Sequence, residues 1–161
     1  MIPLRRLRSI VLSRHAAWAS ARVVLMATLA LAAAPRAGAQ WVNLGHSLSG
    51  GALTPALLNG IGPLLPNTGT KIVLADGLPF GTGTLVVGLT NISAPFKGGV
   101  IVPHPDILVP LVLDASGLWQ IVFPWPAGVP AGLHLYWQAW MPDPGAPKGL
   151  AASNALESTA S

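Results

Sequence analysis

The chain has 161 residues and no cysteine, with nine lysines and arginines against five aspartates and glutamates. Without cysteine there are no disulfides and no thiolate chemistry. All six arginines precede residue 40, and the remainder has three lysines against five acids, a net charge of −2. A chain of this charge has no basic patch to neutralise phosphates, so nucleic acid is excluded as an expected partner.

The first 39 residues have the three parts of a secretory signal peptide. A leader with five arginines precedes an apolar run, 23–34, and Ala37-Gly38-Ala39 supplies the small residues of a cleavage site. At about 1.5 Å per residue this run reaches roughly 18 Å, too short for a bilayer core of ~30 Å. We expect cleavage after Ala39 by the general or the twin-arginine export route. The mature protein is then secreted, periplasmic or at the cell surface, without membrane insertion.

Residues 40–161 are expected to form a single domain of short strands. Glycine and proline interrupt the apolar segments often, which favours a sandwich or a barrel. The prediction is an all-β, antiparallel β-sandwich of seven to nine short strands, with a jelly roll or a partly open barrel as the runner-up. The candidate strands are Trp41–Leu44, Lys71–Ala75, Thr84–Thr90, Val100–Pro103, Ile107–Leu113, Leu118–Trp125, Leu133–Met141 and Gly149–Asn154. Residues Ala155–Ser161 are predicted to be a frayed tail.

Single residues predict local features between and within these strands. Gly88 inside a strand indicates a bulge or a close backbone approach, and Pro110 places its strand at an edge or a bulge. Asn59-Gly60 is typical of a turn, and Ala94–Gly99 is predicted to be a loop.

The stretch expected to contribute the most buried area per residue is Gly117–Met141, which contains four of the six tryptophans. Side chains alternate across a strand, so each of its two arms offers one continuous apolar face. We predict that the arms pair as a hairpin, joined by the repeated Pro-Ala-Gly of 126–132, and form a meander with Ile107–Leu113. The inward residues are Trp119, Ile121, Phe123 and Trp125 in the first arm, and Leu133, Leu135, Trp137, Ala139 and Met141 in the second.

Several short pieces of the mature chain resemble a recurring exported bacterial domain, found alone or at the C-terminus of longer proteins. The pieces are PFKGG (95–99), PHPD (103–106), DASG (114–117), PAGVPAG (126–132), LYWQAW (135–140) and ASNAL (152–156). The resemblance is strongest from Pro95 onward. It implies a small β-domain and an exported location, and it implies no activity, substrate or catalytic residue.

The search for catalytic and metal-binding patterns is negative. Ser47 lies in a GHSLSGG turn that lacks the preceding buried strand and the following helix of a nucleophilic serine. His104 and Asp106 could bind a cation, with calcium the expected ion. Alternatively, Asp106 and Asp114 accept hydrogen bonds from the backbone amides of their own turns. No metalloprotease, EF-hand or phosphate-loop motif is present, so we predict no catalytic residue, no metal site and no cofactor.

The sharpest binding hypothesis concerns the second face of the strand at Leu133–Met141. Its side chains form an aromatic and polar stripe that can stack on a sugar or on a partner's surface: His134, Tyr136, Gln138 and Trp140. Alternatively, the aromatic rings lie under the C-terminal segment and Gln138 holds loop backbone. We therefore expect an exported, non-catalytic accessory or structural module that contacts a glycan or another surface protein. The alternative is a small secreted hydrolase or a metal-dependent enzyme.

Overall fold

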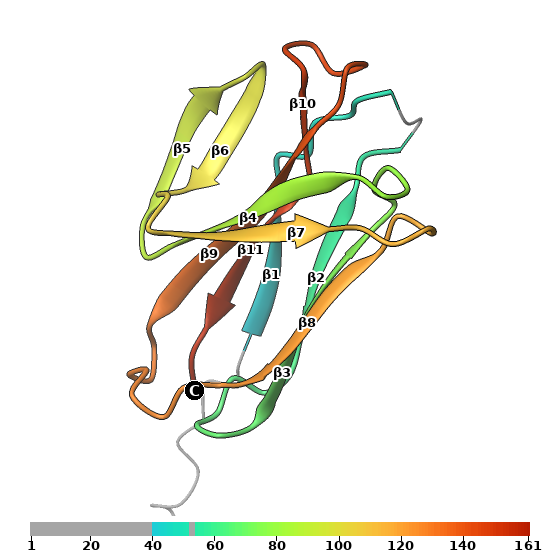
Figure 1. Ribbon diagram of the computed structural model, residues 1–161. Coiled ribbons are helices and arrows are strands. Elements are labelled where there is room, and N and C mark those ends of the chain that lie inside the picture. Colours follow the sequence, from blue (N-terminus) through green and yellow to red (C-terminus); the bar gives the residue numbers. More distant parts are fainter. Residues whose placement is uncertain (1–39, 52–53) are drawn as a thin grey trace, which may run out of the picture. The chain divides into compact units, whose positions relative to one another are not determined.

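The computed structural model describes residues 40–51 and 54–161, so the predicted signal peptide lies outside the described residues. The described residues form eleven strands and no helix (Figure 1). Within these ranges no helix therefore has the length and apolar character to cross a membrane. The strands are β1 (Gln40–Gly45), β2 (Leu57–Ile61), β3 (Gly69–Ala75), β4 (Thr82–Gly88), β5 (Asn91–Phe96), β6 (Gly99–Pro103), β7 (Ile107–Val112), β8 (Trp119–Pro124), β9 (His134–Pro142), β10 (Leu150–Ala152) and β11 (Ala155–Thr159).

Two sheets and a separate hairpin make up the fold (Figure 1). The larger sheet has the strand order β1-β11-β9-β4-β7, and β10 pairs with the end of β9. The smaller sheet has the order β2-β3-β8, and β5 and β6 form the hairpin. All of these pairings are antiparallel. The prediction of an all-β fold with antiparallel sheets in a sandwich is thereby confirmed.

The main core lies between the two sheets and follows the alternation of side chains along each strand. Strands β4, β7 and β9 contribute one side of it, and β2, β3 and β8 contribute the other. The largest fully buried side chain is that of Trp125, which follows β8 directly. The inward residues expected in both apolar arms contact this core, except that Ile121 stands at its margin with 36% of its surface exposed.

The predicted pairing of the two apolar arms is wrong, and so is the predicted meander with Ile107–Leu113, because β7 pairs with β4. β8 pairs with β3 in the smaller sheet, whereas β9 pairs with β4 and β11 in the larger sheet. The arms face each other across the core instead of lying side by side. The physical reason is the connection: residues 126–132 with two prolines are too long and too restricted for a tight hairpin, and they span the ~10 Å between packed sheets.

The structure has eleven strands and not the predicted seven to nine, because three segments predicted as a turn, a loop or a tail belong to strands. Ala155–Ser161 is no frayed tail, since β11 inserts between β1 and β9 and most of its residues are buried. Ala94–Gly99 is no simple loop, because its first residues belong to β5. Asn59-Gly60 is no turn but the middle of β2, where a Cβ on Gly60 would lie 2.1 Å from the ring of Trp41. Glycine is present there because an indole packs on its backbone.

Between β10 and β11, the side chains of Ser153 and Asn154 form hydrogen bonds with backbone groups of neighbouring strands. Ser153 Oγ accepts a hydrogen bond from the backbone N–H of Ala139 at 2.9 Å. Asn154 is 4% exposed and binds both backbone groups of Leu58 in β2: Oδ1 accepts from its N–H at 2.7 Å, and Nδ2 donates to its carbonyl at 3.0 Å. The ASNAL segment thus joins the two sheets at this corner.

Two predictions about single residues are confirmed. β7, which contains Pro110, is the edge strand of the larger sheet. Gly88 lies against the backbone of His104, and a Cβ on Gly88 would be 2.1 Å from the carbonyl oxygen of His104.

Asp114 organises the turn that leads into β8, as expected for an aspartate at a turn. Its Oδ1 accepts hydrogen bonds from the hydroxyl and the N–H of Ser116 and from the N–H of Leu118. The hydrogen bond from the Ser116 hydroxyl, followed by those from the Leu118 and Ser116 N–H groups, lowers the pKa of Asp114 from its ordinary value of 3.8.

Replacing Asp114 with alanine is therefore expected to lower the Tm in a pH-dependent way. Because the pKa of Asp114 is lower in the folded state, its contribution to stability is present above pH 3.8 and is lost as the pH falls through the folded-state pKa. The difference in Tm between wild type and Asp114→Ala should be largest near neutral pH and should shrink below pH 3.8. Thermal unfolding at a series of pH values measures it, and a constant difference would contradict this role.

Candidate functional site

The predicted stripe does lie on one face of β9, but half of it is closed to solvent. Gln138 is fully buried, and Trp140 is 5% exposed. Tyr136 is half-buried, and His134 is exposed. Burial, with a smaller contribution from the charge of Glu157, raises the pKa of Tyr136. The structure therefore does not present the four side chains together as an open surface.

The side chain of Gln138 forms hydrogen bonds with backbone groups of three segments that are far apart in the sequence. Its Oε1 accepts hydrogen bonds from the Val102 N–H at 3.0 Å and from the Trp140 indole N–H at 3.2 Å. Its Nε2 lies within hydrogen-bond distance of three backbone carbonyls, those of His46, Val100 and Ser153. The expectation that Gln138 holds loop backbone matches this geometry.

The hairpin β5–β6 covers Trp140. The ring of Phe96 packs edge-on against Trp140, with 5.0 Å between ring centroids. A groove of about 470 Å³ remains between the hairpin and the larger sheet, and both rings line it together with Ile101 and Leu150. Of the four predicted residues only Trp140 reaches this groove, and it does so with little exposed surface.

Two histidines pair with carboxylates at the surface. His104 Nδ1 lies 2.6 Å from Asp106 Oδ1. A hydrogen bond from the Leu89 N–H, followed by that from His104, lowers the pKa of Asp106. The expectation that Asp106 accepts from the amides of its own turn is wrong, because the amide it binds is that of Leu89, the residue after β4.

The second pair joins His134 Nδ1 to Glu157 Oε1. The hydroxyl of Thr159 lies 3.4 Å from the same Nδ1 atom. A hydroxyl, histidine and carboxylate relay needs the two ring nitrogens to have separate partners, so this set is not arranged for nucleophilic catalysis.

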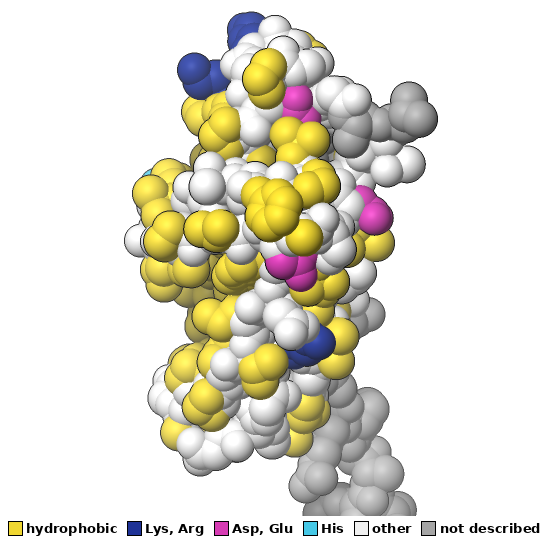
Figure 2. Space-filling view, turned by 45° about the vertical axis from the view of Figure 1, so that its right-hand side comes forward, with side chains coloured by type: hydrophobic (Ala, Val, Ile, Leu, Met, Phe, Trp, Pro, Cys, Tyr) yellow, Lys and Arg dark blue, Asp and Glu magenta, His cyan; other side chains and the backbone are white. Residues whose placement is uncertain are grey.

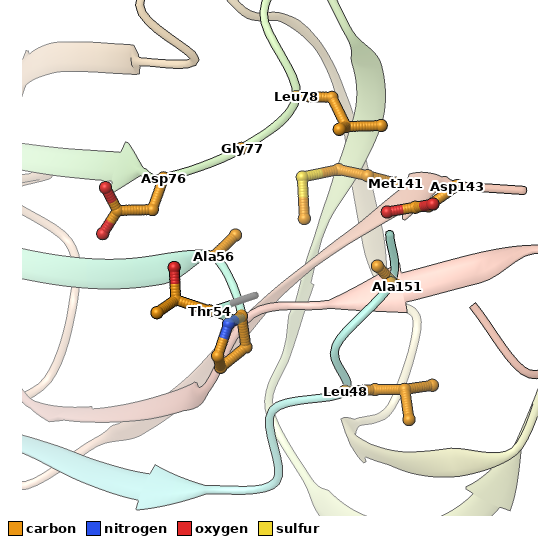
Figure 3. Close-up of a pocket in the computed structure, with 11 residues that line it drawn as sticks. Leu48, Thr54, Ala56, Asp76, Gly77, Leu78, Met141, Asp143 and Ala151 are labelled. Atoms are coloured by element: carbon orange, nitrogen blue, oxygen red, sulfur yellow. The ribbon is translucent and has the colours of Figure 1, made fainter. Parts of the chain in front are cut away.

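Asp143 is the one buried carboxylate of the described residues, and backbone amides bind it. Its oxygens accept hydrogen bonds from the N–H of Gly51 at 3.0 Å and of Gly145 at 2.8 Å. It borders a cavity of about 20 Å³, room for about one water molecule. Figure 3 shows Asp76 on the opposite side of this cavity, with Met141 and Leu78 between the two carboxylates. No group of three acidic or histidine side chains in the described ranges is arranged to hold a metal ion.

The feature best suited to bind a ligand is an apolar cleft where the two sheets separate. Its volume is about 430 Å³, within the range of roughly 300–1,000 Å³ typical of ligand sites. We call it the intersheet cleft, and its lining contains only aliphatic, proline and aromatic side chains. They are Leu85, Val87, Leu89, Ile107, Val109, Trp119, Ile121, Phe123, Trp125, Pro126, Val129, Leu133, Leu135 and Trp137.

The cleft exists because the edge strands β7 and β8 do not pair with each other. Each is the last strand of its sheet. Large apolar side chains remain exposed along its rim, including Ile107 (58%) and Leu89 (57%). Figure 2 brings the side of β8 forward and shows hydrophobic side chains gathered over it, with few charged ones among them. Soluble proteins rarely leave such a surface uncovered without a binding role.

No protein-family model, curated protein or solved structure matches this chain. The candidate site therefore depends on its own geometry and chemistry.

Proposed function

We propose that the mature chain is an exported, non-catalytic accessory module that binds an apolar ligand in the intersheet cleft. The single observation that supports this function is a cleft of about 430 Å³ without a charged side chain in its lining. Burial of a ligand there releases water from both surfaces, and this contributes about 25 cal/mol for each Å² of apolar surface buried. The expected signal peptide supports the location outside the cytoplasm.

Apolar contact is favoured over sugar stacking and over catalysis. A sugar presents several hydroxyl groups, and sites for such ligands combine apolar walls with convergent polar groups. The cleft lacks these groups, and Trp140 is only 5% exposed and packs against Phe96. The two histidine–carboxylate pairs lie at the surface and do not line the cleft.

The function can be tested by filling the cleft with a larger side chain. Val109 in β7 lines the cleft, and Val112 in the same strand is 66% exposed and does not line it. We expect purified mature protein to bind the fluorescent apolar probe N-phenyl-1-naphthylamine. Val109→Trp should weaken binding about tenfold or more, since overfilling an apolar site costs about 1–3 kcal/mol.

The matched variant Val112→Trp makes the same chemical change outside the cleft and should bind the probe as wild type does. Circular dichroism verifies that both variants remain folded. Equal binding by Val109→Trp and wild type, or no binding by wild type, would contradict the proposed site.

A further inference from the structure

The intersheet cleft lies beside a strand whose backbone is paired on one side only. β8 pairs with β3, and in the part of the chain that the structure describes no strand pairs with its other side. Trp125, directly after β8, donates its N–H to the Thr68 carbonyl and so continues the pairing with β3. Bonding directions alternate along an antiparallel strand, so the N–H and carbonyl groups of Gln120 and Val122 point away from β3. We call this row of backbone groups the β8 edge.

The β8 edge lacks the features that usually protect an edge strand, which are charged residues or a proline within the strand. β8 has no charged residue, and its only proline, Pro124, is its last residue. Ile121 and Val122 are both exposed, although their side chains point to opposite faces. β7, the other edge strand at the cleft, is interrupted by Pro110, which has no N–H to donate. An added strand is therefore expected to pair with β8.

The described residues do not supply such a strand themselves. Within 40–161, only residues 52 and 53 lie outside the described ranges, and two residues are too few for a strand. A second copy of the chain offers its own β8, but the inward side chains of that strand already line its own cleft. The strand that fits the cleft therefore belongs to a different polypeptide.

We propose that the intersheet cleft binds an extended segment of another protein, which pairs antiparallel with the β8 edge and directs alternate apolar side chains into the cleft. This inference rests on the proposed function and names the chemistry of its ligand. All strand pairings of the fold are antiparallel. The lining has no charged residue and exposes no polar atom, so it matches uncharged, aliphatic or aromatic side chains. Backbone hydrogen bonds then contribute affinity, and the inserted side chains contribute specificity.

The pairing determines which backbone groups of the segment are needed. In an antiparallel pair, residues that exchange hydrogen bonds lie opposite each other, with their side chains on the same face. Gln120 and Val122 are exposed and do not line the cleft. The residues of the segment that bond to them also point away from the cleft, whereas its inward residues direct their N–H groups away from β8.

The test uses a fluorescein-labelled synthetic peptide in which valine alternates with threonine between terminal lysines. Fluorescence polarisation should show binding to wild type, and unlabelled peptide should displace N-phenyl-1-naphthylamine from the cleft. N-methylation of the threonines should weaken binding about tenfold or more, because it removes hydrogen bonds to the β8 edge. N-methylation of the valines is the matched control and should leave binding nearly unchanged.

Val122→Pro removes one N–H from the β8 edge and does not alter the lining of the cleft. Pro124, two residues later, shows that this edge accepts proline. The variant should bind the peptide about tenfold more weakly and bind the naphthylamine as wild type does. Val112→Pro makes the same change in β7, two residues after Pro110, and should bind both as wild type does. Circular dichroism verifies folding, and the peptide comparison on wild type needs no variant.

The results separate this inference from the proposed function. Binding of the naphthylamine without binding of the alternating peptide, or equal binding of the two methylated peptides, would overturn the strand pairing and leave the apolar site intact. Unchanged peptide binding by Val122→Pro would overturn the role of the β8 edge. A wild-type dimer in sedimentation that dissociates in Val122→Pro would show that a second copy occupies the edge. If neither the naphthylamine nor the peptide binds, both proposals are wrong.

Discussion

Replacing Gln138 with leucine is expected to lower the free energy of unfolding by about 3–5 kcal/mol, which is a large fraction of the stability of a small domain. Leucine has a similar size but cannot accept the hydrogen bonds of the Val102 N–H and the Trp140 indole. It also leaves three backbone carbonyls without their shared donor. Because Gln138 is fully buried, water cannot replace these partners.

Gln120→Leu is the matched control for this experiment. Gln120 lies in β8 and is exposed, so the same substitution should change stability by less than about 0.5 kcal/mol. Urea unfolding of the three proteins measures the difference. Hydrogen exchange should also show faster exchange of the Val102 amide in Gln138→Leu. Equal stability of Gln138→Leu and wild type would show that Gln138 does not tie these segments together.

The second large effect is expected for Gly88→Ala. The new Cβ would lie 2.1 Å from the carbonyl oxygen and 2.8 Å from the nitrogen of His104, and both are backbone atoms that cannot rotate away. The end of β4 or the segment at His104 must move, which strains the hydrogen bond from the His104 N–H to the Thr90 carbonyl. We expect a loss of about 1–3 kcal/mol, as found when a packed site is overfilled.

Gly128→Ala serves as the control for a change of glycine to alanine. A Cβ on Gly128 would meet nothing within 4 Å, and its φ lies outside the left-handed region, so the substitution should be neutral or slightly stabilising. Thermal unfolding of Gly88→Ala, Gly128→Ala and wild type measures the change in Tm that each substitution causes. A Gly88→Ala protein as stable as Gly128→Ala would mean that the close approach at His104 is easily relieved.

The sequence predicts those parts of the fold that depend on local pattern. Alternating apolar residues identify β7, β8 and β9 and the side chains that face the core. Gly88 predicts a close backbone approach, because it has no Cβ. Pro110 predicts an edge strand, because it has no N–H to donate to a neighbouring strand. Asp114 predicts a turn because its carboxylate can accept hydrogen bonds from the N–H groups two and four residues later.

Features that depend on contacts between distant segments could not be predicted in this way. The order of strands is one, since the partners of β8 and β9, which are β3 in one sheet and β4 and β11 in the other, lie far from them in the sequence. The burial of β11 is another, because four of its five residues (Ala155, Glu157, Ser158 and Thr159) are small or polar and become a strand only between β1 and β9. The intersheet cleft follows from that strand order, although the sequence predicts that Trp119, Phe123 and Leu135 all face inward.

The most direct test of the intersheet cleft as a binding site is a two-dimensional ¹H–¹³C NMR spectrum of the mature protein, recorded with and without N-phenyl-1-naphthylamine. We predict that the methyl resonances of Val109, which lines the cleft, shift on binding, whereas those of Val112, which is exposed outside the cleft, stay in place. A spectrum in which the Val109 resonances are unchanged at saturating probe, or in which only those of Val112 respond, would contradict the account.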